Sequence, residues 1–282
     1  MTAGAAYTRV VLGLSGPTSS AAFAAAAEIA HSFEAELAGL FLEDETVLNI
    51  SDLPFCVEIA SAGLARPFRR GDAEAGFRSG FQAARRSLES AARRALVRHS
   101  LARERGSVAE ILARVARAGD IIVFAEPERA IDRACFVNIG YFAAAFACRG
   151  SLLYLPAAAR AWTGGVTAGI GGPGDRDVLA AAARIAASRG VTLTVLAAKG
   201  VKWRSLLRSV LSGTRLRFPA VQEQLFDAAS IEDLVRAAAG RPDDLLVVAH
   251  DRARLAMPEM LHALARSRRA PILLIEPTAA SA

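Results

Sequence analysis

Short apolar runs alternate with longer alanine-rich segments along the whole chain. The runs in the first half are RVVLGL at 9–14, ELAGLFL at 36–42, DIIVFA at 120–125 and SLLYL at 151–155. Strands that are buried on both faces have such continuous apolar runs, and the segments between these runs carry helical spacing or helix-capping residues. The alternation predicts an α/β protein with parallel sheets and helices on both faces.

The chain also contains an internal repeat. Gly13–Ser32 aligns with Gly169–Ser188 at an offset of 156 residues, and both segments begin with Gly-x-x-Gly-Pro and continue with AAAA-x-IA-x-S. The later elements recur as apolar runs at 166–170, 191–196, 244–249 and 272–275. The repeat predicts two tandem doubly wound five-stranded parallel-sheet domains, at residues 1–157 and 163–282. Pro156–Trp162 is the expected linker.

The first half is the longer one, because the offset between matching runs falls from 156 to 124 residues. We expect the 32 extra residues within Glu43–Gly80, as a long connection with one or two helical turns followed by a helix at 77–98. The residues expected on the buried face of this helix are Phe77, Phe81, Leu88, Ala92 and Leu96. Ser107 and Glu110 have the spacing of a capping box for the next helix.

The amino-acid composition limits the classes of function that this protein can have. Hydrophobic residues make up 53% of the chain and charged residues 22%, as in a folded globular protein. No apolar run has the length of a membrane-spanning helix and the amino terminus does not resemble a signal peptide, so we expect a cytoplasmic protein. The net charge of +6 comes from 32 Arg and 2 Lys, a bias that high-GC coding produces, so it favours nucleic acid or anionic lipid only weakly.

Metal-binding and catalytic motifs are absent from the sequence. The cysteines, Cys56, Cys135 and Cys148, form no C-x-x-C pair, and His31, His99 and His262 lack the spacing of metal ligands. No H-E-x-x-H, G-x-S-x-G or P-loop pattern occurs. We therefore expect no metal site, no catalytic residue and no enzymatic activity.

The order of these elements resembles the universal stress protein family in its tandem two-domain form. The resemblance rests on VVLGLSG at 10–16, SVAEILARVARAGDIIVFA at 107–125 and SLLYLP at 151–156. The second half has the counterparts VTAGIGG at 166–172, SIEDLVRAAAGRPDDLLVVA at 230–249 and APILLIEP at 270–277. The resemblance implies domains of the adenine nucleotide alpha hydrolase-like fold.

Family members that bind ATP have an Asp after the first strand and a glycine-rich phosphate loop after the fourth. The Asp position falls here on Ser15, followed by Gly16, in the first half and on Gly171 in the second. The chain reads AEPER at 125–129 and AHDRA at 249–253, with no glycine in either. Glu126 and Glu128 add negative charge where a polyphosphate would lie, so the resemblance implies a degenerate pocket in both halves.

The second-half loop is the other candidate site. Gly169, Gly171, Gly172 and Gly174 match G-x-G-x-x-G before a helix, but no acidic residue ends the following strand, which favours a tight turn over a dinucleotide site. A small anion at the helix N-terminus is an open alternative. His250 ends the fourth strand beside this loop, and a structural role is favoured for it over acid–base chemistry.

The basic stretch at 199–217 is interpreted as a helix packed on its sheet, with Trp203, Leu206, Leu207, Val210 and Leu211 on one face. A membrane-surface or nucleic-acid element is the alternative there.

The expected function is that of a non-enzymatic stress-response protein acting through protein association, without a cofactor and without ATP binding in the family manner. One alternative is a regulatory module that binds a nucleotide or anion in the second-half pocket, and another is a small-molecule enzyme of a related fold. The last strands at 151–155 and 272–275 are expected to pair, either within the chain or with a protein partner in a homodimer. We expect neither nucleic-acid binding nor membrane insertion.

Overall fold

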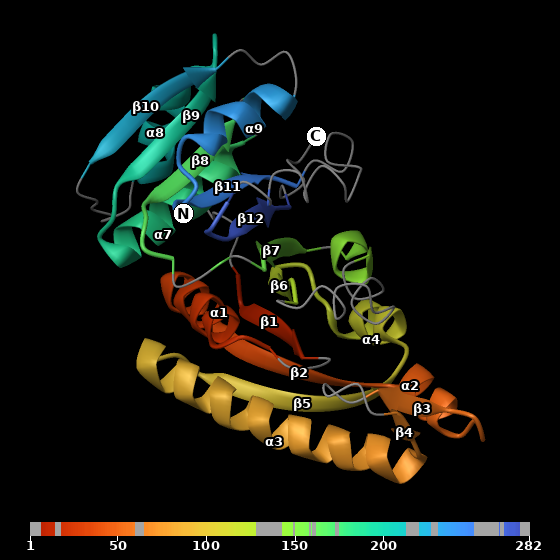
Figure 1. Ribbon diagram of the computed structural model, residues 1–282. Coiled ribbons are helices and arrows are strands. Elements are labelled where there is room, and N and C mark those ends of the chain that lie inside the picture. Colours follow the sequence, from red (N-terminus) through yellow and green to blue (C-terminus); the bar gives the residue numbers. More distant parts are fainter. Residues whose placement is uncertain are drawn as a thin grey trace.

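A ten-stranded sheet runs through the whole computed structural model (Figure 1). The structure describes residues 7–14, 18–59, 65–127, 143–148, 150–157, 159, 162–172, 175–212, 220–226, 231–250, 265 and 268–276. The first-half strands are β1 (Arg9–Leu14), β2 (Glu36–Asp44), β5 (His99–Gly106), β6 (Asp120–Ala125) and β7 (Ser151–Leu155). The second-half strands are β8 (Val166–Ile170), β9 (Leu193–Ala198), β10 (Val221–Phe226), β11 (Leu245–Ala249) and β12 (Ile272–Ile275).

The two halves have the same topology. The strand order is β10-β9-β8-β11-β12-β7-β6-β1-β2-β5, so each half places its first strand between its second and fourth. All strand pairs within a half are parallel, whereas β12 and β7 pair antiparallel, with Leu273 opposite Leu153. The predicted fold class, a tandem pair of doubly wound five-stranded sheets, is confirmed.

Helices cover both faces of the sheet, and each face has its own core. The first core packs α1 (Ser20–Phe33), α3 (Arg70–Ala95), α7 (Arg176–Arg189) and α8 (Trp203–Leu211) against the strands. The second packs α4 (Val108–Val115) and α9 (Ile231–Ala239). Both cores contain residues from both halves, so the apolar interior is continuous across the β7–β12 junction. None of the described helices is long and apolar enough to cross a bilayer.

The pairing of the last strands lies within the chain. Strand β7 lies between β6 and β12, and β12 lies between β11 and β7, so neither strand has a free edge. A homodimer through these strands, one of the two expected arrangements, is therefore wrong for this structure, because their backbone donors and acceptors already have partners. The sheet ends instead at β5 and β10.

A buried polar contact reinforces the junction. The Tyr7 hydroxyl lies 2.8 Å from the Ser151 hydroxyl oxygen at the start of β7, and the Glu276 amide after β12 donates to the same oxygen at 3.0 Å. Tyr7, next to β1, is thereby linked to the end of the last strand of the other half. Burial raises the pKa of Tyr7 to about 12.

Two arginines of α7 connect the helices of the two halves. Arg184 donates from Nε to the Ser32 carbonyl at 2.8 Å and pairs with Glu34 at 3.0 Å, both at the end of α1. The Arg189 guanidinium lies 3.7 Å from the centre of the Trp162 ring and donates to the Trp162 carbonyl at 2.9 Å. Trp162, the last residue of the expected linker, is 5% exposed and is thus packed against α7.

The insertion in the first half is more ordered than its sequence indicates. It contains α2 (Glu45–Ser51) and a hairpin of β3 (Val57–Ile59) with β4 (Ala65–Pro67), and α3 already begins at Arg70. Leu96, expected on the buried face of α3, is 86% exposed, because it is the C-cap residue with a left-handed backbone at φ 57°. The prediction of a capping box at Ser107 is also wrong, since the Ser107 side chain makes no capping hydrogen bond to α4.

The expected helical face of the basic stretch is confirmed where the structure describes it. Trp203 and Leu207 of α8 are buried and Leu206 and Leu211 pack against the first core, so this helix covers its sheet. The proposed domain boundaries and linker stay predictions.

Tyr7 makes the stability of the protein sensitive to alkaline pH. Its pKa is about 10 in the unfolded chain and about 12 in the fold, so its contribution is complete below pH 10 and is lost as the pH rises toward 12. Between about pH 9 and pH 11, the wild type should lose about 1.3 kcal/mol more unfolding free energy than Tyr7→Phe. Urea unfolding of both proteins at each pH measures this difference, and parallel pH profiles would contradict it.

Candidate functional site

Ligands of doubly wound sheets bind beyond the carboxyl ends of the strands, where the strand order reverses. In this chain these places are the ends of β1 and β6 and the ends of β8 and β11. Four predicted site residues, Gly171, Gly172, Glu126 and His250, are described at these strand ends. Ser15, Gly16 and Gly174 lie outside the described residues, as does Glu128.

Glu126 directly follows β6 and closes the first-half edge. Its amide donates to the Leu155 carbonyl at 2.8 Å, and its carboxylate accepts from the Ala157 amide at 3.0 Å. The acidic side chain thus connects the segment after β6 to the segment after β7. A backbone amide that would be free to bind a phosphate oxygen here is held by a carboxylate of the protein itself.

His250 occupies the matching place after β11. Its amide donates to the Ile275 carbonyl at 2.6 Å, its Nδ1 lies 3.4 Å from Glu276 Oε2, and its side chain is fully buried. The ring packs edge-on against Phe146 of the first half, with 4.8 Å between ring centres. His250 therefore lies at the junction of the halves and does not line the second-half pocket, which supports the structural role favoured for it.

Gly169 has a packing role within β8. A β-carbon at this position would lie 2.9 Å from Leu234 of α9 and 2.9 Å from Val248 of β11. Both contacts are closer than real side chains allow, so the glycine permits α9 to approach the sheet. Gly169, predicted as a ligand residue, is not among the residues that line the pocket.

Gly171 and Gly172 form a small anion-binding loop whose donors are already occupied. The Asp175 carboxylate oxygen Oδ2 accepts from the Gly171 amide at 2.6 Å and from the Gly172 amide at 2.9 Å. Consecutive backbone amides that converge on one point bind phosphates in other proteins. Here the carboxylate at the N-cap of α7 takes that position, instead of capping its own helix.

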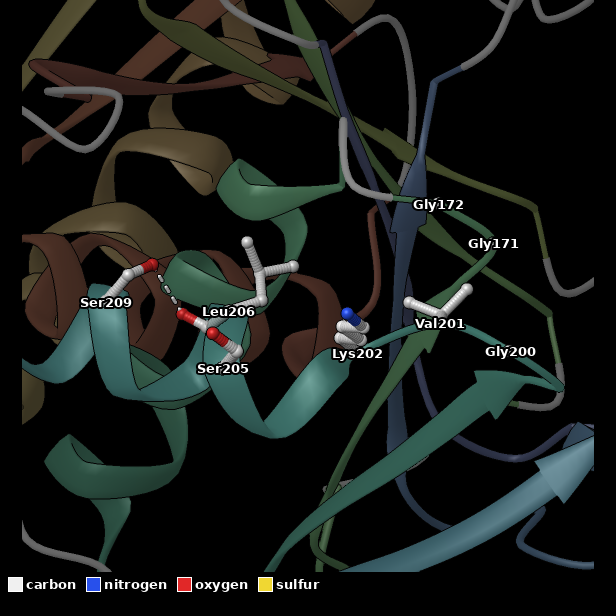
Figure 2. A pocket seen from close by; sticks show the side chains of 8 residues that line it. All are labelled: Gly171, Gly172, Gly200, Val201, Lys202, Ser205, Leu206 and Ser209. Atoms are coloured by element: carbon white, nitrogen blue, oxygen red, sulfur yellow. Dashed lines mark hydrogen bonds between the residues drawn. The ribbon is translucent and has the colours of Figure 1, made fainter.

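A cavity of about 490 Å³ opens beside this loop, between the segment that follows β8 and the segment that leads from β9 into α8 (Figure 2). Its lining residues are Gly171, Gly172, Gly200, Val201, Lys202, Ser205, Leu206 and Ser209. The Lys202 amine has no ion pair among the described residues. The Ser209 hydroxyl donates to the Leu206 carbonyl at 2.7 Å, so it is directed along the helix. The wall is thus mainly apolar, with one cation at its edge.

Sequence reasoning missed Asp175 and the α8 residues of the cavity. Only the hydrogen bonds of the fold show that the Asp175 carboxylate is directed to the loop. Lys202 and Ser205 belong to the basic stretch that was interpreted as a covering helix, and neither residue was predicted to line a cavity. Among the described residues, no group of three His, Cys, Asp or Glu side chains has a geometry suitable for a metal.

Comparison with solved structures finds the crystal structure of a universal stress protein from Archaeoglobus fulgidus DSM 4304. It matches with a TM-score of 0.57 at 11% sequence identity, over 95% of this chain and 97% of that chain. At this identity the match shows a shared fold. No family model matches the chain, and no curated protein matches it.

The loop contacts of Asp175 can be tested with a pair of variants. Asp175→Ala removes both hydrogen bonds and should lower the unfolding free energy by about 1 kcal/mol, whereas Asp175→Asn keeps an acceptor oxygen and should lose less. The freed amides of Asp175→Ala should also bind inorganic phosphate. Thermal unfolding with and without phosphate measures both effects, and a phosphate shift of the same size in the wild type would contradict the occupied loop.

Proposed function

We propose that this chain is a tandem universal-stress-type protein, a non-enzymatic stress-response protein that acts through protein association and does not bind ATP in the family manner. The proposal rests on the shared fold and on the contacts made at the carboxyl ends of the strands in each half. In both halves, the residue after the fourth strand is engaged with the segment after the fifth strand.

The contact of Glu126 with the Ala157 amide is the observation that carries the proposal. A polyphosphate bound there would displace a carboxylate from its donor and would lie beside its negative charge. In a partly enclosed site, repulsion between two like charges at about 4 Å costs about 1–4 kcal/mol, which corresponds to one to three orders of magnitude in affinity.

The second half supports the same proposal by a different contact. His250 is packed under Phe146 and its neighbour across the edge is Glu276, so its imidazole is buried among described side chains of both halves. A buried imidazole without access to a ligand is poorly placed for acid–base chemistry. Both edges therefore favour a role without catalysis.

Direct titration with ATP tests the proposal. We expect no saturable binding heat, with a Kd above about 1 mM, in calorimetry of the purified chain. Glu126→Gly is the informative variant, because it removes the carboxylate and frees the Ala157 amide. Micromolar ATP binding by the wild type would contradict the proposal, and stronger binding by the variant alone would support the role given to Glu126.

The cavity favours a second candidate, a regulatory module that binds a nucleotide or another anion in the second half. The volume of about 490 Å³ is within the usual range for small-molecule sites, and Lys202 offers a cation at its edge. The occupied loop disfavours a phosphate directly on Gly171 and Gly172. An anion in this candidate would instead lie at Lys202, with its apolar part against Val201 and Leu206.

Neutralising the cavity lysine distinguishes the two candidates. If the second candidate holds, ADP or ATP raises the melting temperature of the wild type, and Lys202→Gln loses most of that shift. Arg208→Gln is the matched control, because it removes one positive charge from the same helix outside the cavity lining. Equal melting-temperature shifts in both variants, or no shift in the wild type, would exclude the cavity as a nucleotide site.

A further inference from the structure

The positive charge of the chain is concentrated in one segment. Of the 34 Lys and Arg and 28 Asp and Glu residues, 66–117 contain 13 and 5, so this segment has a net charge of +8. The remaining residues then have a net charge of −2. A coding bias toward arginine acts on the whole chain and does not explain this separation. The segment runs from the end of β4 through α3 and β5 to α4, and α3 lies on the outer side of the first half (Figure 1).

Helix α3 has six of these arginines and three of the acidic residues, a net charge of +3, and it presents part of the positive charge as a row. Its 26 residues extend over about 39 Å, and its buried residues, Ala73, Leu88, Ala91 and Ala92, face the sheet. At 100° per residue, Arg78, Arg86 and Arg93 fall within about 80° of one another, with Arg86 and Arg93 opposite the buried residues and Arg78 about 100° from their centre, at the side of the helix. The exposed arginines of α3 and its end without an ion pair among the described residues are Arg78, Arg86, Arg93, Arg94 and Arg98.

Exposed apolar side chains lie at both ends of this row. Near the N-terminus of α3 they come from α2, β3 and the turn between them, and are Ile50, Leu53, Phe55 and Val57, with Phe55 76% exposed. A hydrogen bond of 2.7 Å from Arg70 to Asp52 fixes this group against the start of the helix. At the other end is Leu96, which is 86% exposed.

Leu96 is not explained by the stability of the fold. It has φ 57° at the C-cap of α3, where glycine or asparagine is the residue that the backbone favours. A leucine there strains the backbone and exposes nearly its whole side chain to water. Such a residue at the end of a row of free arginines indicates a surface that meets an apolar phase.

We propose that the outer face of α3, with the exposed residues of the insertion and Leu96, docks on an anionic lipid bilayer. The free guanidinium groups match anionic headgroups over the length of the helix, and the apolar side chains at its ends match the interfacial region. Aliphatic side chains such as Leu53, Val57 and Leu96 add little to a contact with nucleic-acid phosphates. A second copy of the chain would bring the same positive charge against this face.

Vesicle co-sedimentation of the full chain tests this surface. We expect binding to phosphatidylcholine vesicles that contain about 30 mol% phosphatidylglycerol, and at least tenfold weaker binding to vesicles of phosphatidylcholine alone. Raising the salt from about 0.1 M to about 0.5 M should weaken binding at least tenfold, because the charges are exposed. Equal binding to both kinds of vesicle, or no binding to either, overturns the proposal.

Charge-reversal variants locate the surface. Arg78→Glu, Arg86→Glu and Arg93→Glu together should reduce anionic-vesicle binding at least tenfold. The control combines Arg176→Glu, Arg208→Glu and Arg269→Glu, which are exposed in the second half and give the same net charge. Equal losses in the two triple variants would show attraction by net charge alone and would overturn the assignment to α3.

A variant of Leu96, at the apolar end of the row, distinguishes a lipid partner from a nucleic-acid partner. Leu96→Gly relieves the backbone strain, so it should keep or raise the melting temperature while lowering vesicle binding severalfold. Binding of a short duplex DNA should not change in this variant. Tight DNA binding that depends on the α3 arginines, without vesicle binding, would replace the bilayer by nucleic acid as the partner.

Discussion

The antiparallel pairing of β7 with β12 is the constraint on which the rest of the structure depends. It satisfies the backbone donors and acceptors of two strands that would otherwise be exposed edges. It also fixes the distance at which the helices of the halves meet, so that Arg184 reaches the end of α1 and Phe146 covers His250. The two apolar cores can extend across the halves only because this junction makes one sheet.

The buried strands could be predicted from the sequence alone, but the edge strands could not. β1, β6, β7 and β12 lie where continuous apolar runs predict them, since burial on both faces leaves that pattern. The strands at the ends of the sheet, His99–Gly106 and Val221–Phe226, are mainly exposed and carry charged or polar residues. Their backbones pair with β2 and β9, and such pairing leaves no periodic signal.

In the candidate site, features set by neighbouring residues could likewise be predicted from the sequence, whereas contacts between distant residues could not. The glycine loop after β8 could be located from the repeat, because turn residues are a local signal. The contact of Asp175 with that loop depends on a side-chain rotation, and the contact of His250 with Phe146 joins residues that are 104 positions apart. Glu126 was expected to oppose phosphate by its charge, and its hydrogen bond to Ala157 adds a structural reason.

The contacts at the strand-end edges and the charged outer face of α3 lie in different parts of the fold. At the strand-end edges, the Glu126 carboxylate accepts from the Ala157 amide, the His250 amide donates to the Ile275 carbonyl, and the Asp175 carboxylate accepts from the Gly172 amide. The second half has few added residues with which to build a new surface. The first half has α2, the β3–β4 hairpin and the long α3, all outside the sheet. Because the outward-facing residues of these elements do not enter the core, they are free to vary toward a partner.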